Sequence, residues 1–172
     1  MKKSRSEVKR GVRKPVIGVM GPAKAGPREL ADARELGELI ARQGWVLLTG
    51  GKASGVMDAA SQGAKRVSNS LTIGILPDEK TRVSRFVDVA IVTDLGNARN
   101  NVNVMSSDVI VACGLGGAGT VSEVALALKA KKGVILLDAG KAGVGLFKDL
   151  APGLVHAASS PEEAVQLIME LL

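Results

Sequence analysis

The sequence predicts an α/β protein in which helices cover both faces of a parallel sheet. Short apolar runs alternate with segments of helical periodicity along most of the 172 residues, which is typical of βαβ units. The runs are apolar at nearly every position, as expected of parallel strands that are buried on both faces. The length corresponds to one domain. We therefore expect a single doubly wound, Rossmann-like domain at residues 15–172, with six to seven strands.

The strands are expected at the apolar runs. Pro77 ends the third run and Gly114 follows the fifth, and neither residue type favours continuation of a central strand. In chain order the predicted strands are 16–20, 45–49, 71–76, 87–92, 109–113 and 133–137, with a short edge strand at 154–156.

Helices are expected where apolar residues recur every three to four positions. Leu30, Leu36 and Ile40 share one face of a predicted helix at 28–43, and Gly44 follows it as a C′ residue. Further helices are predicted at 56–67, at 97–106 and over the segment that ends at Lys129.

The last helix has a distinct start signal. Ser160 is its predicted N-cap, Pro161 occupies N1 and Glu163 occupies N3, which together form a capping box. The segment 138–150 is rich in glycine and lysine, and we expect it to be an irregular loop.

Ligands bind beyond the carboxyl ends of the strands in doubly wound sheets, where the strand order reverses. The loops after the first, second, fourth and fifth strands hold most of the glycine-rich and unpaired polar sequence. In the first three of these loops the candidate ligand-binding residues are Gly21, Pro22, Lys24, Gly50, Gly51, Lys52, Asn97, Arg99 and Asn100.

The loop after the fifth strand has the strongest functional pattern. It contains four glycines within six residues and leads directly into a helix. Glycines let the backbone approach a ligand, and the first free N–H groups of the helix then point at it. This geometry binds anions, above all phosphate, although tight strand-to-helix turns also use glycine without a ligand. The predicted phosphate-binding residues are Gly116, Gly117, Ala118, Gly119 and Thr120.

The same turn also matches a dinucleotide-binding motif. Gly114, Gly116 and Gly119 satisfy G-x-G-x-x-G, and Asp138 ends the next strand about twenty residues later. The motif lies on the fifth strand, however, whereas the dinucleotide pattern belongs to the first βαβ unit. This position argues against NAD as the ligand.

Four charged residues near the expected ligand site each have two alternative interpretations. Glu123 completes Thr-x-x-Glu with Thr120, which is either a capping box or a carboxylate that stabilises a positive centre or activates water. Arg99 is either a bidentate phosphate ligand or an ordinary residue at a helix start. Lys24 and Lys52 are either anion-binding or simply solvated.

Other residues with reactive or soft side chains are assigned to the core. Cys113 ends the fifth strand and is expected to be buried as a small apolar residue. His156 is the only histidine, so no histidine-based triad or metal cluster can form. Met20, Met57 and Met105 are expected to pack in the core.

Composition excludes several classes of protein. Two Phe, one Trp and no Tyr argue against single-stranded nucleic-acid binding, which uses aromatic stacking. A single cysteine and the absence of long apolar runs predict a cytoplasmic protein that does not span a membrane. No lysine is marked as a pyridoxal-phosphate site.

The net charge of +6 lies in the N-terminal segment. Residues 1–14 hold seven Lys or Arg and one acid, Glu7, whereas residues 15–172 hold sixteen bases and sixteen acids. We expect residues 1–14 to be a disordered, solvated tail. Binding to nucleic acid or an acidic partner and a targeting role are the alternatives.

The glycine motifs resemble those of the LOG family. Residues 115–123 are similar to its PGGxGTxxE signature and residues 50–57 to its second glycine motif, although Leu115 replaces the proline and Lys52 a glycine. The resemblance implies a Rossmann-like oligomer that cleaves nucleoside 5′-monophosphates into base and ribose 5-phosphate. Arg99 and Glu123 would then be the catalytic pair and residues 116–120 the phosphate cradle.

A narrower resemblance runs from about Lys14 to the C-terminus. The segments 14–22, 44–51, 95–101 and 125–132 are similar to the molybdenum cofactor carrier proteins of green algae, which share the LOG fold. This resemblance implies a homo-oligomer, tetramer or dimer, that holds molybdenum cofactor for molybdoenzymes or cofactor-synthesis proteins and has no catalytic turnover. It also implies that the ligand-binding residues above, with Glu123, hold the cofactor.

Overall fold

The computed structural model describes residues 13–172. Most of the predicted basic tail, residues 1–12, therefore lies outside the described residues. Arg13 donates hydrogen bonds to the carboxylate of Asp108, with Nη2 2.5 Å from Oδ1. That carboxylate also accepts a hydrogen bond from the backbone N–H of Val16, so it links the first residues of the fold to the strand that begins at 109.

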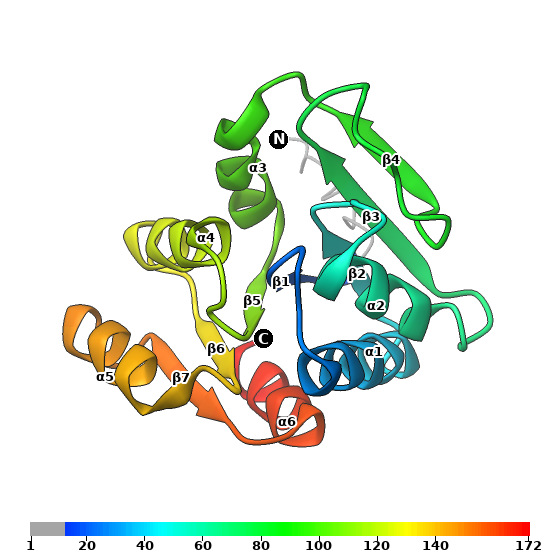
Figure 1. Cartoon of the computed structure of the whole chain (residues 1–172). Coiled ribbons are helices and arrows are strands. Elements are labelled where there is room, and N and C mark those ends of the chain that lie inside the picture. Colours follow the sequence, from blue (N-terminus) through cyan, green and yellow to red (C-terminus); the bar gives the residue numbers. More distant parts are fainter. Residues whose placement is uncertain (1–12) are drawn as a thin grey trace, which may run out of the picture.

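Seven parallel strands form one sheet, in the order β4-β3-β2-β1-β5-β6-β7 (Figure 1). This confirms the predicted doubly wound α/β fold. The strands are β1 (Val16–Met20), β2 (Val46–Thr49), β3 (Leu71–Leu76), β4 (Val89–Val92), β5 (Val109–Cys113), β6 (Val134–Leu137) and β7 (Val155–Ala158). The helices are α1 (Pro27–Arg42), α2 (Gly55–Ala64), α3 (Arg99–Ser106), α4 (Ala118–Lys129), α5 (Gly140–Leu150) and α6 (Pro161–Leu171), with a 3-10 turn η1 (Gly96–Ala98) before α3.

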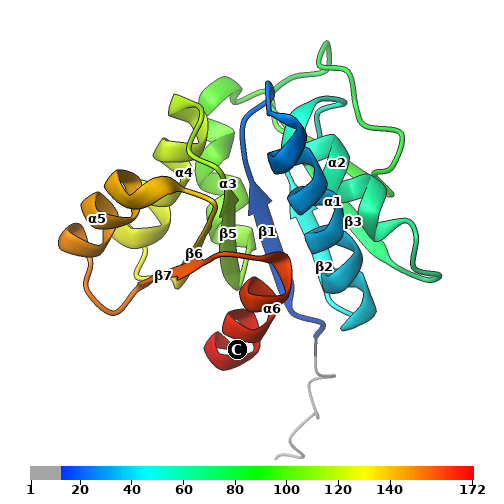
Figure 2. The ribbon, with the colours of Figure 1, turned by 60° about the horizontal axis from the view of Figure 1, so that its bottom comes forward.

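Helices cover the two faces of the sheet in equal number. Figure 2 shows α1 and α6 side by side on one face, where α2 also packs, while α3, α4 and α5 cover the other. Successive side chains of strand β5 pack alternately on the two faces of the sheet. Val109 and Val111 point to the α1 side, and Ile110 and Ala112 point to the α4 side. The aliphatic runs therefore build two apolar layers, one above and one below the sheet.

The strand order reverses between β1 and β5. The chain adds β2, β3 and β4 on one side of β1 and then returns to place β5 on the other. Crossover connections of this kind leave an open crevice at the carboxyl ends of the two strands at the reversal. The loops after β1 and β5 flank that crevice.

The prediction of an irregular loop at 138–150 was wrong, because Gly140–Leu150 forms helix α5. Gly140, Gly143 and Gly145 lower the helix propensity of this segment. Phe147 is nevertheless 3% exposed and packs in the layer on the α4 side. Burial of this side chain outweighs the weak local preference.

Two predicted helix boundaries are confirmed in detail. Gly44 follows α1 with φ +74°, which is the left-handed conformation of a C′ residue. Ser160 caps α6, and its hydroxyl accepts a hydrogen bond from the N–H of Glu163 at 3.2 Å. In a capping box, the carboxylate of Glu163 would accept a hydrogen bond from the N–H of Ser160. It instead accepts hydrogen bonds from the N–H and hydroxyl of Ser159, one residue before the cap.

Strand β4 differs from its neighbours in exposure. All four of its side chains are exposed, with Ile91 at 43% and Val92 at 50%. It is the edge strand next to β3 (Figure 1).

The helices of residues 13–172 include none with the length and apolar character needed to span a membrane.

Candidate functional site

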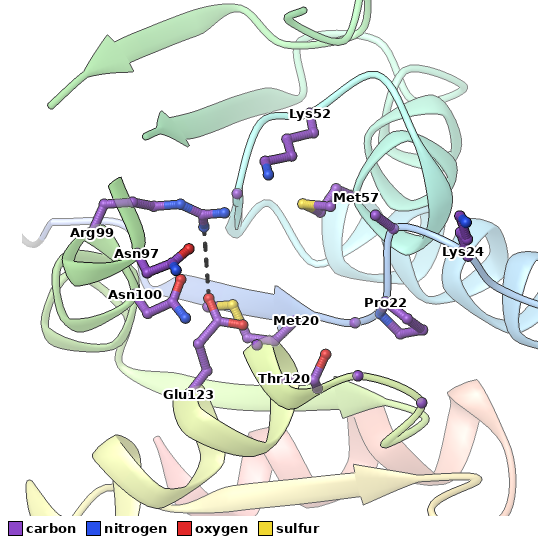
Figure 3. Close-up of a pocket in the computed structure, with 16 residues that line it drawn as sticks. Met20, Pro22, Lys24, Lys52, Met57, Asn97, Arg99, Asn100, Thr120 and Glu123 are labelled. Carbon is purple, nitrogen blue, oxygen red and sulfur yellow. Dashed lines mark ion pairs between the residues drawn. The ribbon is translucent and has the colours of Figure 1, made fainter. Parts of the chain in front are cut away.

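A cavity of about 300 Å³ lies at the carboxyl ends of the central strands, where the strand order reverses (Figure 3). Its walls come from the loops after β1, β2 and β5, from η1 and the start of α3, and from the first two turns of α2 and α4. The lining residues are Met20, Gly21, Pro22, Ala23, Lys24, Gly50, Lys52, Met57, Asn97, Arg99, Asn100, Gly116, Gly117, Gly119, Thr120 and Glu123.

The structure brings together all of the predicted ligand-binding residues except Gly51 and Ala118. Gly51 packs against strand β3 on the side of the loop away from the cavity. Its φ is +72°, and a Cβ there would lie 2.9 Å from the Cα of Gly74 on β3. Ala118 faces a groove between α3 and α4. These two residues thus shape the elements that carry the cavity wall.

Three lining residues were not among the predicted ones. Met20 and Met57, expected in the core, are 1% and 7% exposed, yet both side chains point toward the cavity in Figure 3. Met20 ends β1 at the strand reversal, a position that could have indicated its role. Met105, also expected in the core, is 56% exposed, so that prediction was wrong. Ala23 lies in the loop after β1.

The glycine turn after β5 ends as the N-terminus of α4. Gly117 is the N-cap, in an extended conformation with φ −153° and without a side chain to cap the helix. The N–H groups of Ala118, Gly119 and Thr120 form the first turn and have no hydrogen-bond partner among residues 13–172. Free N–H groups and the positive end of the helix dipole together favour an anion here.

The capping interpretation of Glu123 was wrong. Because Gly117 is the N-cap, Thr120 is the third residue of the helix and Glu123 lies a turn further on. Its carboxylate is therefore too far along α4 to return to the N-cap. Its side chain is 8% exposed and lines the cavity.

Two residues of α3 hold the carboxylate of Glu123. Asn103 is fully buried and donates from Nδ2 to Oε1 at 2.7 Å. Arg99 Nη1 lies 3.7 Å from the same oxygen (Figure 3). Burial raises the pKa of Glu123, and the Asn103 hydrogen bond and the Arg99 charge oppose that rise.

Arg99 reaches the cavity because Gly50 has no side chain. A Cβ on Gly50 would lie 2.6 Å from Arg99 Nη1 and 2.8 Å from Met57 Sδ. The Arg99 side chain is 10% exposed, and its buried Nε has no hydrogen-bond partner in the described chain. Burial lowers the pKa of this guanidinium, while Glu123 raises it. The guanidinium stays protonated despite this lowering of its pKa. Arg99 therefore has N–H groups beside the cavity that are free to donate hydrogen bonds to a ligand.

Two lysines add positive charge at the rim. Lys52 is held by an isolated antiparallel bridge to Val83, and the next N–H, of Ala53, donates to the carbonyl of Arg82 at 3.0 Å. Lys24 is exposed on the loop after β1. With Arg99 the lining has three cations and one acid, which favours an anionic ligand.

The acid of the dinucleotide motif lies elsewhere. Asp138 is in the left-handed region with φ +53°, and its Oδ2 is 3.4 Å from Nε of Arg28. It lines a separate hollow beside α5. The structure therefore does not bring Asp138 into the cavity that the glycine turn lines.

In the part of the chain that the structure describes, the side chains that usually bind metal ions do not form a cluster. Cys113 is fully buried, and burial raises the pKa of its thiol far above the usual value. Residues 13–172 contain no cluster of three His, Cys, Asp or Glu side chains placed to hold a metal ion.

Comparison with known proteins indicates what this arrangement resembles. The model of the SLOG cluster4 family matches residues 14–165. The structure is similar to a molybdenum cofactor binding protein from the phototrophic bacterium Rippkaea orientalis, with 57% identity, 93% of this chain and 98% of that chain covered and a TM-score of 0.89. It is also similar to the molybdenum cofactor carrier protein of Chlamydomonas reinhardtii, with 49% identity, 92% and 98% covered and a TM-score of 0.86. An uncharacterised protein of Archaeoglobus fulgidus is 45% identical over 121 residues, 70% of this chain and 78% of that protein.

Proposed function

We propose that this chain, which belongs to the SLOG cluster4 family, binds molybdenum cofactor and carries it without catalytic turnover. One observation carries the proposal: the cavity joins an uncapped helix N-terminus to a buried arginine within a chain 57% identical to a molybdenum cofactor binding protein. The cofactor is an anion at both ends, with a phosphate on its pterin and an oxygenated molybdenum head.

The phosphate would lie at the N-terminus of α4. The N–H groups of Ala118, Gly119 and Thr120 and the Thr120 hydroxyl are free to donate to it within the described chain. Thr120 is 2% exposed, so its hydroxyl has a fixed place in the wall. Helix N-termini bind phosphate through such N–H groups and the helix dipole.

The anionic molybdenum head would lie toward the other end of the cavity. Arg99 extends from the start of α3 to the loop after β2 that carries Lys52, and both side chains point toward the cavity in Figure 3. Arg99 is held by burial and by Gly50, so it offers a positive charge with little loss of side-chain entropy. The residues would thus neutralise both ends of the ligand.

Binding can be tested with a variant that changes the charge at the helix N-terminus. A Cβ at Gly119 would meet nothing within 4 Å, so Gly119→Asp should fold and place a carboxylate where the phosphate is proposed to bind. We expect wild-type protein to slow the oxidation of molybdenum cofactor and Gly119→Asp to lose that protection. Gly145→Asp, in an equally open position on α5, is the matched control. Equal protection by both variants would contradict the proposal.

A second function has a specific observation in its favour. Arg99 and Glu123 lie 3.7 Å apart in one cavity, and they are the pair expected to cleave the N-glycosidic bond in the LOG family. We therefore keep a phosphoribohydrolase acting on nucleoside 5′-monophosphates as the alternative. Release of adenine from AMP by wild-type protein, abolished in Glu123→Ala, would favour this enzyme over the carrier.

A homo-oligomer belongs to the same proposal. Strand β4 has exposed apolar side chains and contains no Lys or Pro. Lys and Pro residues on an edge strand oppose its pairing with the edge strand of another chain. A second copy presents the same uncharged edge, so pairing of the two edges would cover both. We expect Ile91→Lys to lower the mass measured by light scattering, and Val121→Lys, on α4, to leave it unchanged.

A further inference from the structure

Glu123 is the one carboxylate among the residues that line the cavity. Its two oxygens have different surroundings. Oε1 accepts the hydrogen bond from Asn103 and faces Arg99. Oε2 has no hydrogen-bond partner among residues 13–172 and is not sealed from the cavity. The cavity therefore contains three cationic side chains and one carboxylate oxygen, Oε2 of Glu123, that is free to accept a hydrogen bond from a ligand.

The arrangement is more specific than a counter-ion for Arg99. At 3.7 Å the distance from Nη1 to Oε1 exceeds that of a hydrogen bond, so Arg99 and Glu123 do not satisfy each other. Asn103 makes the closer contact, and its position one turn after Arg99 puts both side chains on the same face of α3. Since Asn103 donates to Oε1, any proton on Glu123 resides on Oε2, toward the cavity.

We propose that Glu123 accepts a hydrogen bond from an N–H or O–H group of the ligand and that Asn103 is the positioning residue that orients it. The cavity would then select phosphate esters that carry such a donor over simple phosphates. This inference rests on the proposed phosphate site at α4. A buried acceptor left without its donor costs binding free energy, which is the basis for rejecting ligands without the donor.

Three probes separate the donor from the phosphate. The phosphate ester of 6-hydroxymethylpterin has N–H donors on its pterin ring and no free hydroxyl on its side chain. Ribose 5-phosphate has hydroxyl donors only, and inorganic phosphate has neither a ring nor a sugar. Their dissociation constants would be measured by titration calorimetry on the full chain. The variants are Glu123→Gln and the control Glu170→Gln, an exposed position near the end of α6.

The expected effect follows from Asn103. If the new Gln side chain keeps its oxygen at Asn103 Nδ2, its N–H₂ turns toward the cavity and a ligand donor meets a donor. If the Asn103 amide instead turns its unpartnered Oδ1 toward Gln, the ligand donor meets a neutral amide oxygen in place of the carboxylate. In both orientations the acceptor is lost or weakened, and we expect Glu123→Gln to weaken binding of a donor-bearing probe at least about tenfold. Binding of inorganic phosphate should not change. Loss confined to 6-hydroxymethylpterin phosphate assigns an N–H donor, and loss confined to ribose 5-phosphate assigns a hydroxyl.

The role of Asn103 has its own readout. Asn103→Leu removes the hydrogen bond that lowers the pKa of Glu123, so Glu123 should gain its proton at a higher pH. Affinity for the donor-bearing probe, compared with wild type at each pH, should then begin to fall at a higher pH as the solution is acidified. A purely structural role of Asn103 would lower the affinity for all three probes by the same factor at every pH.

Several results would overturn the inference. These are a uniform loss across the three probes in Glu123→Gln, no loss for any of them, or failure of wild type to bind either donor-bearing probe. If wild-type protein still protects molybdenum cofactor in those cases, the proposed carrier function stands without this role for Glu123. If protection is absent while the selective loss is present, the function fails and the donor recognition remains.

Discussion

Glu123 gives the stability of the protein a distinctive pH dependence. Burial raises its pKa above the value of 4.5 that applies to an exposed carboxyl. A group whose folded-state pKa is raised contributes stability that is complete below the unfolded-state pKa and is lost as pH rises through the folded-state pKa. We expect the free energy of unfolding of wild type relative to Glu123→Gln to decrease from about pH 4.5 upward, as urea unfolding between pH 4 and 8 would measure.

The control for this prediction is a carboxylate with the opposite shift. Side-chain hydrogen bonds from Arg42 and Arg66 lower the pKa of Glu38. Its contribution is present above the unfolded-state pKa and lost as pH falls, so Glu38→Gln should show the reverse slope. Parallel slopes for the two variants would contradict the assigned shift of Glu123.

Residues could be predicted from sequence where their role is local. The glycine turn was predicted because four glycines between a strand and a helix have a direct backbone meaning. Asn103 gained its role only through packing, since the sequence does not indicate that α3 places it against α4. Met20 and Met57 were predicted as buried, which is correct, but apolar character alone does not distinguish a core from a cavity wall.

At the scale of elements, glycine sets the approach of α1 to α2. A Cβ on Gly37 would overlap the carbonyl oxygen of Ala60, and one on Gly63 would overlap that of Arg34. These obstacles are backbone atoms, so the helices would have to separate. We expect Gly37→Ala and Gly63→Ala each to lower the free energy of unfolding by about 2 kcal/mol. Gly145→Ala, with open space on α5, should instead raise it by about 0.5–1 kcal/mol. Urea denaturation gives all three, and equal effects at the three sites would refute the packing argument.

Two serines at helix starts provide a second comparison between elements. Ser160 accepts a hydrogen bond from the N–H of Glu163, whereas the Ser54 side chain makes no capping hydrogen bond at the start of α2. We expect Ser160→Ala to lower the free energy of unfolding by about 1 kcal/mol and Ser54→Ala to have little effect. Thermal unfolding of both variants is the measurement. A larger loss in Ser54→Ala would show that the cap is not the stabilising contact.

Elements were predictable where the local pattern and the packing agree. The strands β1, β3 and β5 begin and end as predicted, because each is a mostly apolar run and most of its residues are buried in the sheet. Helix α5 was missed because its glycines indicate a loop, while its stability comes from placing Phe147 against the sheet. Such tertiary stabilisation has no signature in propensity.

At the scale of the molecule, the strand order explains why distant segments meet. The loops after β1 and β5 are about ninety residues apart in sequence, yet β1 and β5 are paired neighbours. The prediction that ligands bind where the order reverses relies on this arrangement alone. The cavity thus joins the half of the sheet built from β1 to β4 with the half built from β5 to β7, and a ligand in it contacts both halves.

A ligand that contacts both halves should stabilise the whole fold, because it binds the folded chain and not the unfolded one. At a concentration of 100 times Kd the expected gain is about 2.7 kcal/mol. For a domain of this size that corresponds to a rise in Tm of roughly 5–10 °C. Calorimetry with molybdenum cofactor should show this rise in wild type and in Gly145→Asp, and only a small one in Gly119→Asp, where the carboxylate opposes the phosphate. A full rise in Gly119→Asp would place the anion away from α4, and the phosphate site would have to be sought at Lys52 and Arg99.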